Sequence, residues 1–300
     1  MSVYRSFLFT PGNHPRRVEK CLSLETDAVI LDLEDAVAQN EKASTRPEVV
    51  TAVTQPRRCQ AYVRVNALST AWSYGDIEAV VVAGLDGIVL PKVESAGDLQ
   101  TAEWMISALE RARGLKPGAI DLMPIIETAK GYVALESILN SGTRVRRVAF
   151  GAGDFTLDAG IRWSSDETEL LPYRSAIVVH SRAAGLEPPI DTVWVDLRNP
   201  QGFERCVQHV RDLGFQGKMC IHPDQVSVVN QTFRPSEAEL TRARKVVAAF
   251  EQAEQQGLAA IQVDGQMVDY PIVHAAQRVL DREAAIVQGL RAHQSGPQGR

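Results

Sequence analysis

Two carboxylates follow apolar segments of the sequence. Glu127 comes directly after the apolar run 121–126, and Asp154 follows the run 145–151. If these runs are neighbouring strands, both carboxylates project from one edge, where their oxygens could hold a hard cation such as Mg²⁺. Alternatively, they cap the helical segments that follow them. Spacing alone leaves both interpretations open.

Other charged residues lie in or just after apolar runs. Asp32, Glu34 and Asp35 could form a second set of metal ligands, but we favour salt bridges. Arg64 lies within an apolar run, and a buried guanidinium needs a carboxylate partner from either the protein or an anionic substrate. Lys92 has the same two options, a carboxylate of the protein or of a substrate, and a Schiff base is a third and less favoured one. The remaining polar residues at such positions are Asn66, Glu94, Asp196 and His222.

The apolar runs predict the elements that position these residues. Eight runs rich in Val, Ile and Leu occupy residues 4–9, 28–33, 60–65, 87–91, 121–126, 145–151, 192–196 and 217–221. Nearly continuous apolar strands are typical of parallel sheets covered by helices. Helical periodicity at 95–113 and 169–184 favours a (β/α)₈ TIM barrel, whose active site lies at the carboxyl ends of the strands. A doubly wound sheet would need a Gly-rich turn after its first strand, and TPGN at 10–13 is not one.

The chain continues beyond the end of the predicted barrel. A helix is predicted over 235–256, a strand-like segment over 262–269 and a last helix from about residue 271. We therefore predict a catalytic barrel domain at 1–230 and a C-terminal helical extension at 231–290. The extension packs either on its own barrel or on a neighbouring subunit. Residues 291–300 are expected to be disordered.

The composition argues against several classes of function. Hydrophobic residues make up 45% and charged residues 23% of the chain, as in ordinary globular proteins. The net charge of −5 argues against nucleic-acid binding, and no apolar run is long enough to cross a membrane. The first residues contain no apolar signal core, so we expect a cytoplasmic protein. The four cysteines form no C-x-x-C pair, and we expect buried thiols.

Basic residues gather early in the chain. They follow the first two predicted strands and could form a rim that binds an anion, although a solvated helix face is the more common arrangement. These residues are Arg16, Arg17, Lys20, Lys42 and Arg46.

Eight short motifs occur in a recognisable order. They are FTPGN (9–13), LDLEDAV (31–37), VRVN (63–66), LPKVE (90–94), IETA (126–129), FGAGDF (150–155), GKMCIHP (217–223) and DGQMVDYP (264–271). The ordered set resembles the citrate lyase β-subunit-like family, within the HpcH/HpaI aldolase and citrate lyase superfamily. The resemblance extends from about residue 4 to residue 285. Because the chain continues through 264–271, it most resembles the stand-alone citramalyl-CoA and malyl-CoA lyases of that family.

The resemblance implies roles for particular residues. Glu127 and Asp154 would bind Mg²⁺, for which Mn²⁺ can substitute, and Arg64 would hold the keto-acid end of the substrate. Asp269 would be a catalytic acid/base supplied to a neighbouring subunit of a homotrimer or hexamer. Gly153, where many relatives have Glu, is a departure from the family pattern. Further contacts to substrate would come from Phe9, from Ile190 and Asp191 along the thioester channel, and from Arg16, Lys20, Lys42 and Arg46 at the CoA phosphates.

The implied activity is Mg²⁺-dependent cleavage of a carbon–carbon bond in a 3-hydroxy acyl-CoA. Citramalyl-CoA or malyl-CoA would yield acetyl-CoA and pyruvate or glyoxylate. One alternative is a malyl-CoA thioesterase. A second is a citrate lyase β subunit acting on an acyl carrier protein, against which the extension and the early basic residues argue. A third is a non-catalytic acyl-CoA-binding protein, against which the intact set of Arg64, Glu127, Asp154 and Asp269 argues.

Overall fold

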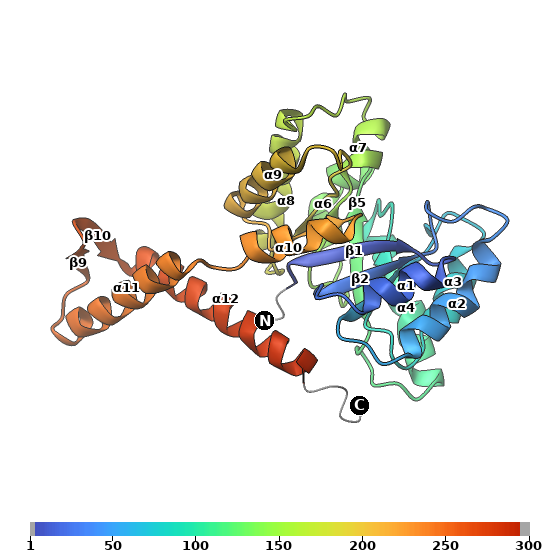
Figure 1. The fold of residues 1–300 in the computed structure, drawn as a ribbon, viewed down its shortest axis with the longest axis horizontal. Helices are drawn as coiled ribbons and strands as arrows, with labels where there is room; N and C mark the ends of the chain where they lie inside the picture. Colours follow the sequence, from blue (N-terminus) through green and yellow to red (C-terminus); the bar gives the residue numbers. More distant parts are fainter. Residues whose placement is uncertain (1–3, 295–300) are drawn as a thin grey trace. The chain divides into compact units, whose positions relative to one another are not determined.

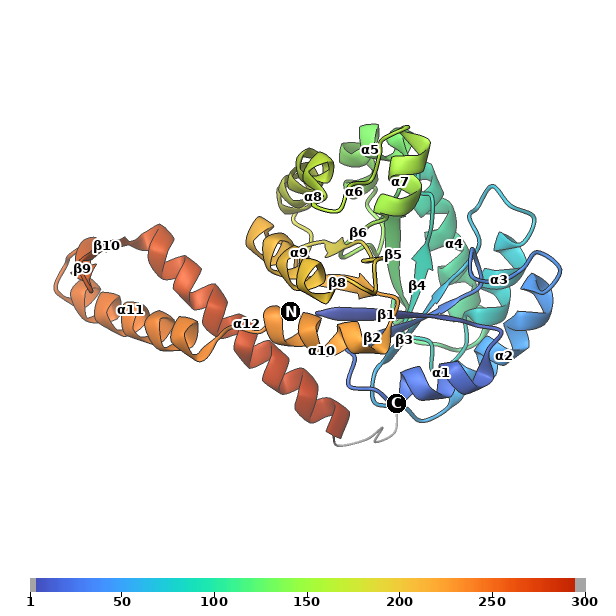
Figure 2. The ribbon, with the colours of Figure 1, turned by 45° about the horizontal axis from the view of Figure 1, so that its top comes forward.

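A computed structural model describes residues 4–294, with side chains described as far as residue 289. Eight parallel strands close into a barrel in sequence order, with helices around them (Figures 1 and 2). The predicted (β/α)₈ barrel is therefore confirmed. The strands are β1 (Ser6–Pro11), β2 (Ala28–Asp32), β3 (Gln60–Arg64), β4 (Gly87–Leu90), β5 (Asp121–Ile126), β6 (Ala149–Phe150), β7 (Ile190–Asp191) and β8 (Gly217–Cys220).

Several helices begin at residues whose side chains satisfy free backbone groups, and two examples lie in the barrel. The Ser95 hydroxyl accepts from the Asp98 N–H at 3.2 Å, and the Asp98 carboxylate accepts from the Ser95 N–H at 2.9 Å. The Asn199 side chain accepts from the Gly202 N–H at 2.9 Å. The helices are α1 (Pro15–Leu22), α2 (Lys42–Thr54), α3 (Ser73–Val80), α4 (Ala96–Ala112), α5 (Ala129–Val133), α6 (Leu135–Leu139), α7 (Ala152–Asp158), α8 (Leu171–Ala183), α9 (Pro200–Leu213) and α10 (Pro223–Thr232), with a 3₁₀ turn, η1 (Thr168–Leu170), before α8.

Two strands differ from the prediction. The predicted position of the seventh strand, 192–196, is wrong. β7 ends at Asp191, and it pairs with β6 and β8. The prediction followed the apolar residues at 193–195, which lie beyond the ladder, where the Trp194 carbonyl accepts from the Gln225 side chain at 3.0 Å. The sixth strand is shorter than 145–151, because only Ala149 and Phe150 pair with β5.

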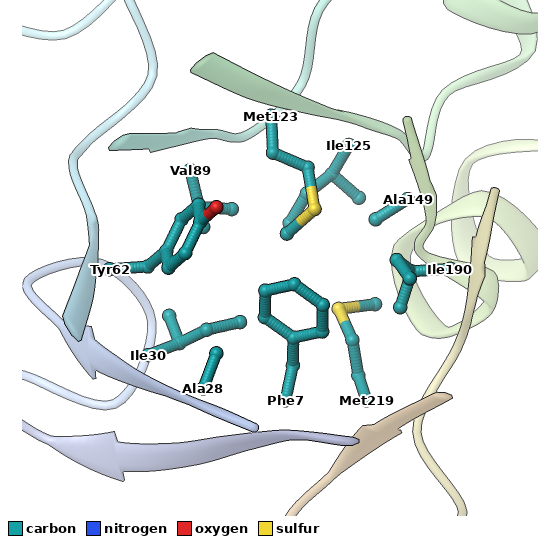
Figure 3. Close-up of a cluster of buried hydrophobic side chains, with 10 residues drawn as sticks. All are labelled: Phe7, Ala28, Ile30, Tyr62, Val89, Met123, Ile125, Ala149, Ile190 and Met219. Atoms are coloured by element: carbon teal, nitrogen blue, oxygen red, sulfur yellow. The ribbon is translucent and has the colours of Figure 1, made fainter. Parts of the chain in front are cut away.

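Inward-facing side chains fill the barrel interior (Figure 3). At the start of β5, the Tyr62 hydroxyl donates to Asp121 at 2.7 Å, and Arg147 donates to the same carboxylate at 2.5 Å. These buried polar groups lie at the amino-terminal end of the barrel, away from the strand ends that position the site. The interior cluster draws on all eight strands and consists of Phe7, Ala28, Ile30, Tyr62, Val89, Met123, Ile125, Ala149, Ile190 and Met219.

The described chain divides into two compact units, with the barrel at 4–230 and a second unit from residue 231. In the second unit, two helices pack together, and an antiparallel hairpin connects them. Helix α12 continues past residue 290, and residues 295–300 of the expected disordered tail lie outside the described residues. The elements are α11 (Glu237–Gln255), β9 (Ala260–Val263), β10 (Gln266–Asp269) and α12 (Tyr270–Gln294).

The hairpin of the second unit turns at Asp264 and Gly265. Both residues have positive φ, at 50° and 77°, as a tight two-residue hairpin turn requires. The Phe250 and Tyr270 rings lie 5.0 Å apart, centre to centre. The hairpin and both helices thus share one small apolar core, whose buried residues are Val246, Phe250, Val263 and Val268.

None of the helices within residues 4–294 combines the length and the apolar character needed to cross a membrane. All four cysteines are buried free thiols, as predicted. Burial raises the pKa of Cys59, Cys206 and Cys220 to about 12. At neutral pH these three thiols are therefore protonated and poor nucleophiles.

We expect Gly87→Ala to destabilise the barrel. A Cβ at Gly87 would lie 2.2 Å from Cε1 of the fully buried Tyr62, and overpacking of this kind costs about 1–3 kcal/mol. Gly97→Ala is the matched control, because the nearest atom to a Cβ there is 3.5 Å away. Chemical denaturation should show a lower free energy of unfolding for Gly87→Ala and no loss for Gly97→Ala. Equal values for the two variants would contradict this account of the packing.

Candidate active site at the carboxyl end of the barrel

Charged residues from four consecutive strand ends meet at the carboxyl end of the barrel. Asp32 ends β2, Arg64 ends β3, Lys92 follows β4 and Glu127 follows β5. Arg64 contacts Asp32, Glu34 bridges Arg64 and Lys92, and the Lys92 N–H donates to Glu127. The convergence expected from the sequence is therefore present at these four strands.

Arg64 lies at the centre of this group. Its Nε and Nη2 donate to the two carboxylate oxygens of Asp32 at 2.8 and 2.6 Å, and its guanidinium lies 4.9 Å from the centre of the Phe9 ring. Nη1 lies 2.8 Å from Oε2 of Glu34, which accepts no hydrogen bond. The protein therefore supplies the carboxylates that a buried guanidinium needs. Nη1 is ion-paired with Glu34 but forms no hydrogen bond with a described residue.

Glu34 and Lys92 form a second ion pair. Nζ of Lys92 lies 2.5 Å from Oε1 of Glu34 and 3.5 Å from Oδ2 of Asp35. The favoured interpretation of the acidic residues after β2, salt bridges, is thus confirmed. Burial raises the pKa of Glu34, although Arg64 and Lys92 act to lower it. The backbone of Lys92 has a φ of 51°, a conformation that costs about 1–3 kcal/mol and is concentrated at functional sites.

Glu127 is almost completely buried, with 2% of its surface exposed. Its Oε1 accepts from the Lys92 backbone N–H at 2.8 Å, whereas Oε2 accepts no hydrogen bond from the residues described. The pKa of Glu127 is raised to about 8, chiefly by burial and further by the carboxylates of Glu34 and Asp154, against the effect of Arg64. A carboxylate in such surroundings favours a proton or a cation as its partner.

Gly151 allows β6 to approach Glu127 closely. A Cβ at Gly151 would lie 2.5 Å from Oε2 of Glu127 and 2.6 Å from its Cβ. Any other residue would therefore displace the buried carboxylate. The sequence analysis missed this role; a glycine at the end of a predicted buried strand is the feature that could have indicated it.

Asp154 lies in the first turn of α7 and is half-buried. Its charge is one of the causes that raise the pKa of Glu127. The Asp154 carboxylate forms no hydrogen bond or ion pair with any residue between 4 and 289. Each predicted metal ligand thus has an oxygen without a partner among the described residues, and their joint role as metal ligands stays a prediction.

The alternative interpretation of these carboxylates, as helix caps, does not hold. Thr128, not Glu127, caps α5, because its hydroxyl accepts from the Gly131 N–H at 3.0 Å. At the start of α7, the Ala152 N–H donates to the Thr192 hydroxyl at 3.0 Å, and no side chain of α7 itself forms a cap. The two carboxylates are therefore available for other chemistry.

The donor set fits Mg²⁺, which prefers oxygen ligands and usually keeps several waters with one or two carboxylates. Oε2 of the buried Glu127 has no partner that would balance its charge, and a cation would supply one. Among the described residues, no group of three or more His, Cys, Asp or Glu side chains could hold a metal ion. A metal at this end of the barrel would therefore depend on Glu127, Asp154 and water.

The early basic residues differ in how free their charged ends are. Arg16 and Lys20 are exposed on α1. Lys42 is only 6% exposed, and its ammonium donates to two backbone carbonyls at 3.2 and 2.9 Å. Arg46 donates to the buried Asp76 at 2.8 Å. Of the four residues predicted to meet CoA phosphates, Arg16 and Lys20 have exposed charged ends, whereas the charges of Lys42 and Arg46 already have partners within the protein.

Ile190 and Asp191 are completely buried. Ile190 belongs to the barrel interior, and Asp191 accepts from Arg174 at 2.8 Å and from Lys218 at 2.5 Å. Since neither side chain reaches a surface, this position does not fit the predicted lining of a thioester channel.

Asp269 belongs to the second unit, at the end of β10. It is half-buried, and Oδ1 accepts from the Ile272 N–H at 3.4 Å, at the start of α12. Its other carboxylate oxygen has no hydrogen bond to any residue that the structure describes. Its predicted role as an acid or base stays a prediction.

Known proteins are similar to this chain in both sequence and fold. The family model for HpcH/HpaI aldolase/citrate lyase matches residues 5–223. The citrate lyase subunit beta of Leuconostoc mesenteroides subsp. cremoris is 39% identical over 92% of this chain and 92% of its own length. The mitochondrial citramalyl-CoA lyase of Rattus norvegicus is 30% identical over 94% of this chain and 86% of its own. A solved structure of CitE from Mycobacterium tuberculosis with magnesium, acetoacetate and coenzyme A has a TM-score of 0.75, with 30% identity over 94% of this chain and 98% of that chain.

These similarities correct one expectation and establish the family. The match to the citrate lyase subunit covers 92% of both chains, so it includes most of the extension, and the extension does not argue against a citrate lyase β subunit. The family model covers more than half of the chain, including Arg64, Glu127 and Asp154. The chain therefore belongs to the HpcH/HpaI aldolase/citrate lyase family.

Proposed function

We propose that the protein is a Mg²⁺-dependent carbon–carbon lyase that cleaves a 3-hydroxy acyl-CoA into acetyl-CoA and a 2-keto acid. Citramalyl-CoA and malyl-CoA, which give pyruvate and glyoxylate, are the substrates proposed. The observation that supports the proposal most is the buried Glu127 carboxylate, which has one oxygen unpartnered and a pKa raised in part by the charge of Asp154. The magnesium and coenzyme A bound by the related CitE structure also support it.

In this proposal, Glu127 and Asp154 hold the metal. Bound Mg²⁺ would act as a Lewis acid, contributing on the order of several kcal/mol to the stabilisation of charge on the substrate oxygen. Arg64 would orient the substrate carboxylate through Nη1, while Asp32 holds the guanidinium in place. Arg16 and Lys20, whose charged ends are exposed, would meet the CoA phosphates.

The bond that breaks joins the hydroxyl-bearing carbon to the α-carbon of the thioester. A base accepts the hydroxyl proton, the new carbonyl forms, and the electron pair of the broken bond passes to the thioester enolate. A proton must then be added to the α-carbon to give acetyl-CoA. We propose that Asp269 of a neighbouring subunit donates it, in a homotrimer or hexamer; its half-buried carboxylate with one free oxygen suits that role.

Product analysis tests the proposed reaction. The protein is incubated with citramalyl-CoA, malyl-CoA and free citrate, with Mg²⁺ and with excess EDTA. We expect acetyl-CoA and a keto acid from one of the two CoA esters, only when Mg²⁺ is present. Release of the hydroxy acid and free CoA would instead identify a thioesterase. Activity only with an acyl carrier protein thioester would identify a citrate lyase β subunit. No turnover of any of these substrates would favour a non-catalytic acyl-CoA-binding protein.

Glu127→Gln and Asp154→Ala should each lower turnover to the level measured in excess EDTA. Gln at 127 can still accept from the Lys92 N–H, so the loss reflects the missing charge. Glu94→Gln is the control, because the Glu94 carboxylate pairs with the exposed Lys130. Steady-state rates with and without Mg²⁺ are the measurement, and thermal unfolding checks the fold. Full activity of Glu127→Gln or Asp154→Ala would contradict the metal assignment.

Arg64→Lys should weaken pyruvate or glyoxylate binding about tenfold or more, because hydrogen bonds to charged groups contribute about 1.5–3 kcal/mol and lysine cannot form the fork. CoA binding should change little. Isothermal titration calorimetry measures both ligands. Arg144→Lys, at another arginine paired with two carboxylates, shows the general cost of the substitution. If the keto-acid affinity of Arg64→Lys is unchanged, Arg64 does not bind the substrate and serves only in its ion pairs with Asp32 and Glu34.

Asp269→Asn should keep the oligomer and substrate binding but lower the rate by about two to four orders of magnitude, the range for lost general acid–base catalysis. Asp264→Asn is the matched control, because it changes an exposed carboxylate in the turn of the same hairpin. Asp269→Asn and Glu127→Gln subunits are then unfolded and reassembled together. Partial recovery of activity is expected if Asp269 acts on a neighbouring subunit. Mixed oligomers without recovery would show that it does not.

A further inference from the structure

A buried network of charged residues connects β7 and β8 with helix α8. Asp191 accepts from Arg174 at 2.8 Å and from Lys218 at 2.5 Å, and Glu167 accepts from Arg174 at 2.8 Å. Their exposed fractions are 0% for Asp191 and Lys218, 1% for Arg174 and 5% for Glu167. Two acids and two bases balance one another, so the network needs no further ion. The proposed reaction does not use it.

Glu167 connects this network to the loop that follows α7. Its Oε2 accepts from Arg174 and from the Cys206 thiol, and its Oε1 accepts from the indole N–H of Trp163 at 3.1 Å. The backbone of Glu167 has a φ of 54°, which costs about 1–3 kcal/mol and persists only where the surroundings fix it. Both of its carboxylate oxygens are bound, so the surroundings do fix it.

The ring of Trp163 lies near Gly153, in the first turn of α7. A Cβ built on Gly153 would lie 3.5 Å from Cζ3 of the indole, which is ordinary contact. Gly153 precedes Asp154, whose carboxylate has no hydrogen bond to any described residue. The place of Asp154 therefore depends on the backbone of α7, a helix of only 7 residues.

We propose that Glu167 is a positioning residue for the metal site. By holding the ring of Trp163 near Gly153, it limits the movement of the turn of α7 that presents Asp154. This inference rests on the proposed function, because it takes Asp154 to be a metal ligand. Residues that orient ligands without touching the metal change metal affinity by about 10–100-fold.

Helix α7 has further supports that do not involve Trp163. The Ala152 N–H donates to the Thr192 hydroxyl at 3.0 Å, and the Phe155 and Tyr173 rings lie 4.6 Å apart, centre to centre. Substitution of Trp163 should therefore loosen the turn that carries Asp154 without unfolding the helix. A purely structural role would lower the melting temperature and leave metal affinity unchanged.

Binding of Mn²⁺ to the full-length protein, measured by electron paramagnetic resonance without substrate, tests the proposal. Trp163→Ala should weaken Mn²⁺ binding about tenfold. Trp163→Phe, which keeps a ring but lacks the N–H that reaches Glu167, should also weaken it, to a smaller extent. Trp104→Ala is the matched control, because Trp104 is 69% exposed on α4, and it should bind Mn²⁺ like the wild type. Asp154→Ala is measured alongside.

The outcomes separate the two proposals. Wild-type Mn²⁺ affinity in Asp154→Ala would overturn the metal site itself. Loss of binding in Asp154→Ala, with both Trp163 variants as tight as Trp104→Ala, would overturn the positioning role alone. Weak binding in Trp163→Ala with wild-type binding in Trp163→Phe would also overturn it, since the hydrogen bond to Glu167 would then be dispensable.

Discussion

The balance of charge at the carboxyl end of the barrel is the constraint on which the site depends. Arg64 is bound to both oxygens of Asp32, and Lys92 is bound to Glu34, so their charges are shared with other carboxylates and offset that of Glu127 only in part. A buried carboxylate whose charge is offset only in part favours a proton or a cation as a further partner. A divalent cation would satisfy Glu127 and Asp154 together. The carboxylates that share this end are Asp32, Glu34, Asp35, Glu127 and Asp154, against the two cationic side chains of Arg64 and Lys92.

The barrel holds this charge in place because the strand ends are fixed by the ladder and by the apolar interior (Figure 3). Two backbone features complete the site. The left-handed conformation of Lys92 is accompanied by an N–H that donates to Glu127, and the missing side chain of Gly151 gives that carboxylate its space. Asp154 differs from the others, since it lies on α7 rather than on a strand. Because the barrel ladder does not fix α7, we propose that Trp163 and Glu167 support it separately.

Much of the barrel could be predicted from the sequence, because buried parallel strands appear as apolar runs and their polar ends show where the site lies. The salt bridges after β2 were predictable because several acidic and basic residues fall at such strand ends. The place of β7 was not, because residues 193–195 have the pattern of a strand although the ladder pairs Ile190 and Asp191. Partners distant in sequence were also hidden. Lys42 and Arg46 lie in a basic cluster, yet backbone carbonyls and Asp76 take up their charges.

The central claim is that a divalent cation binds between Glu127 and Asp154. A crystal grown with Mn²⁺, with anomalous diffraction recorded at the manganese edge, tests it most directly. The account predicts one strong anomalous peak within bonding distance of both carboxylates, about 2.1 Å if the ion takes the geometry of Mg²⁺. An anomalous peak at Asp32 and Glu34 instead would contradict the claim. So would the absence of any peak near Oε2 of Glu127 at saturating Mn²⁺.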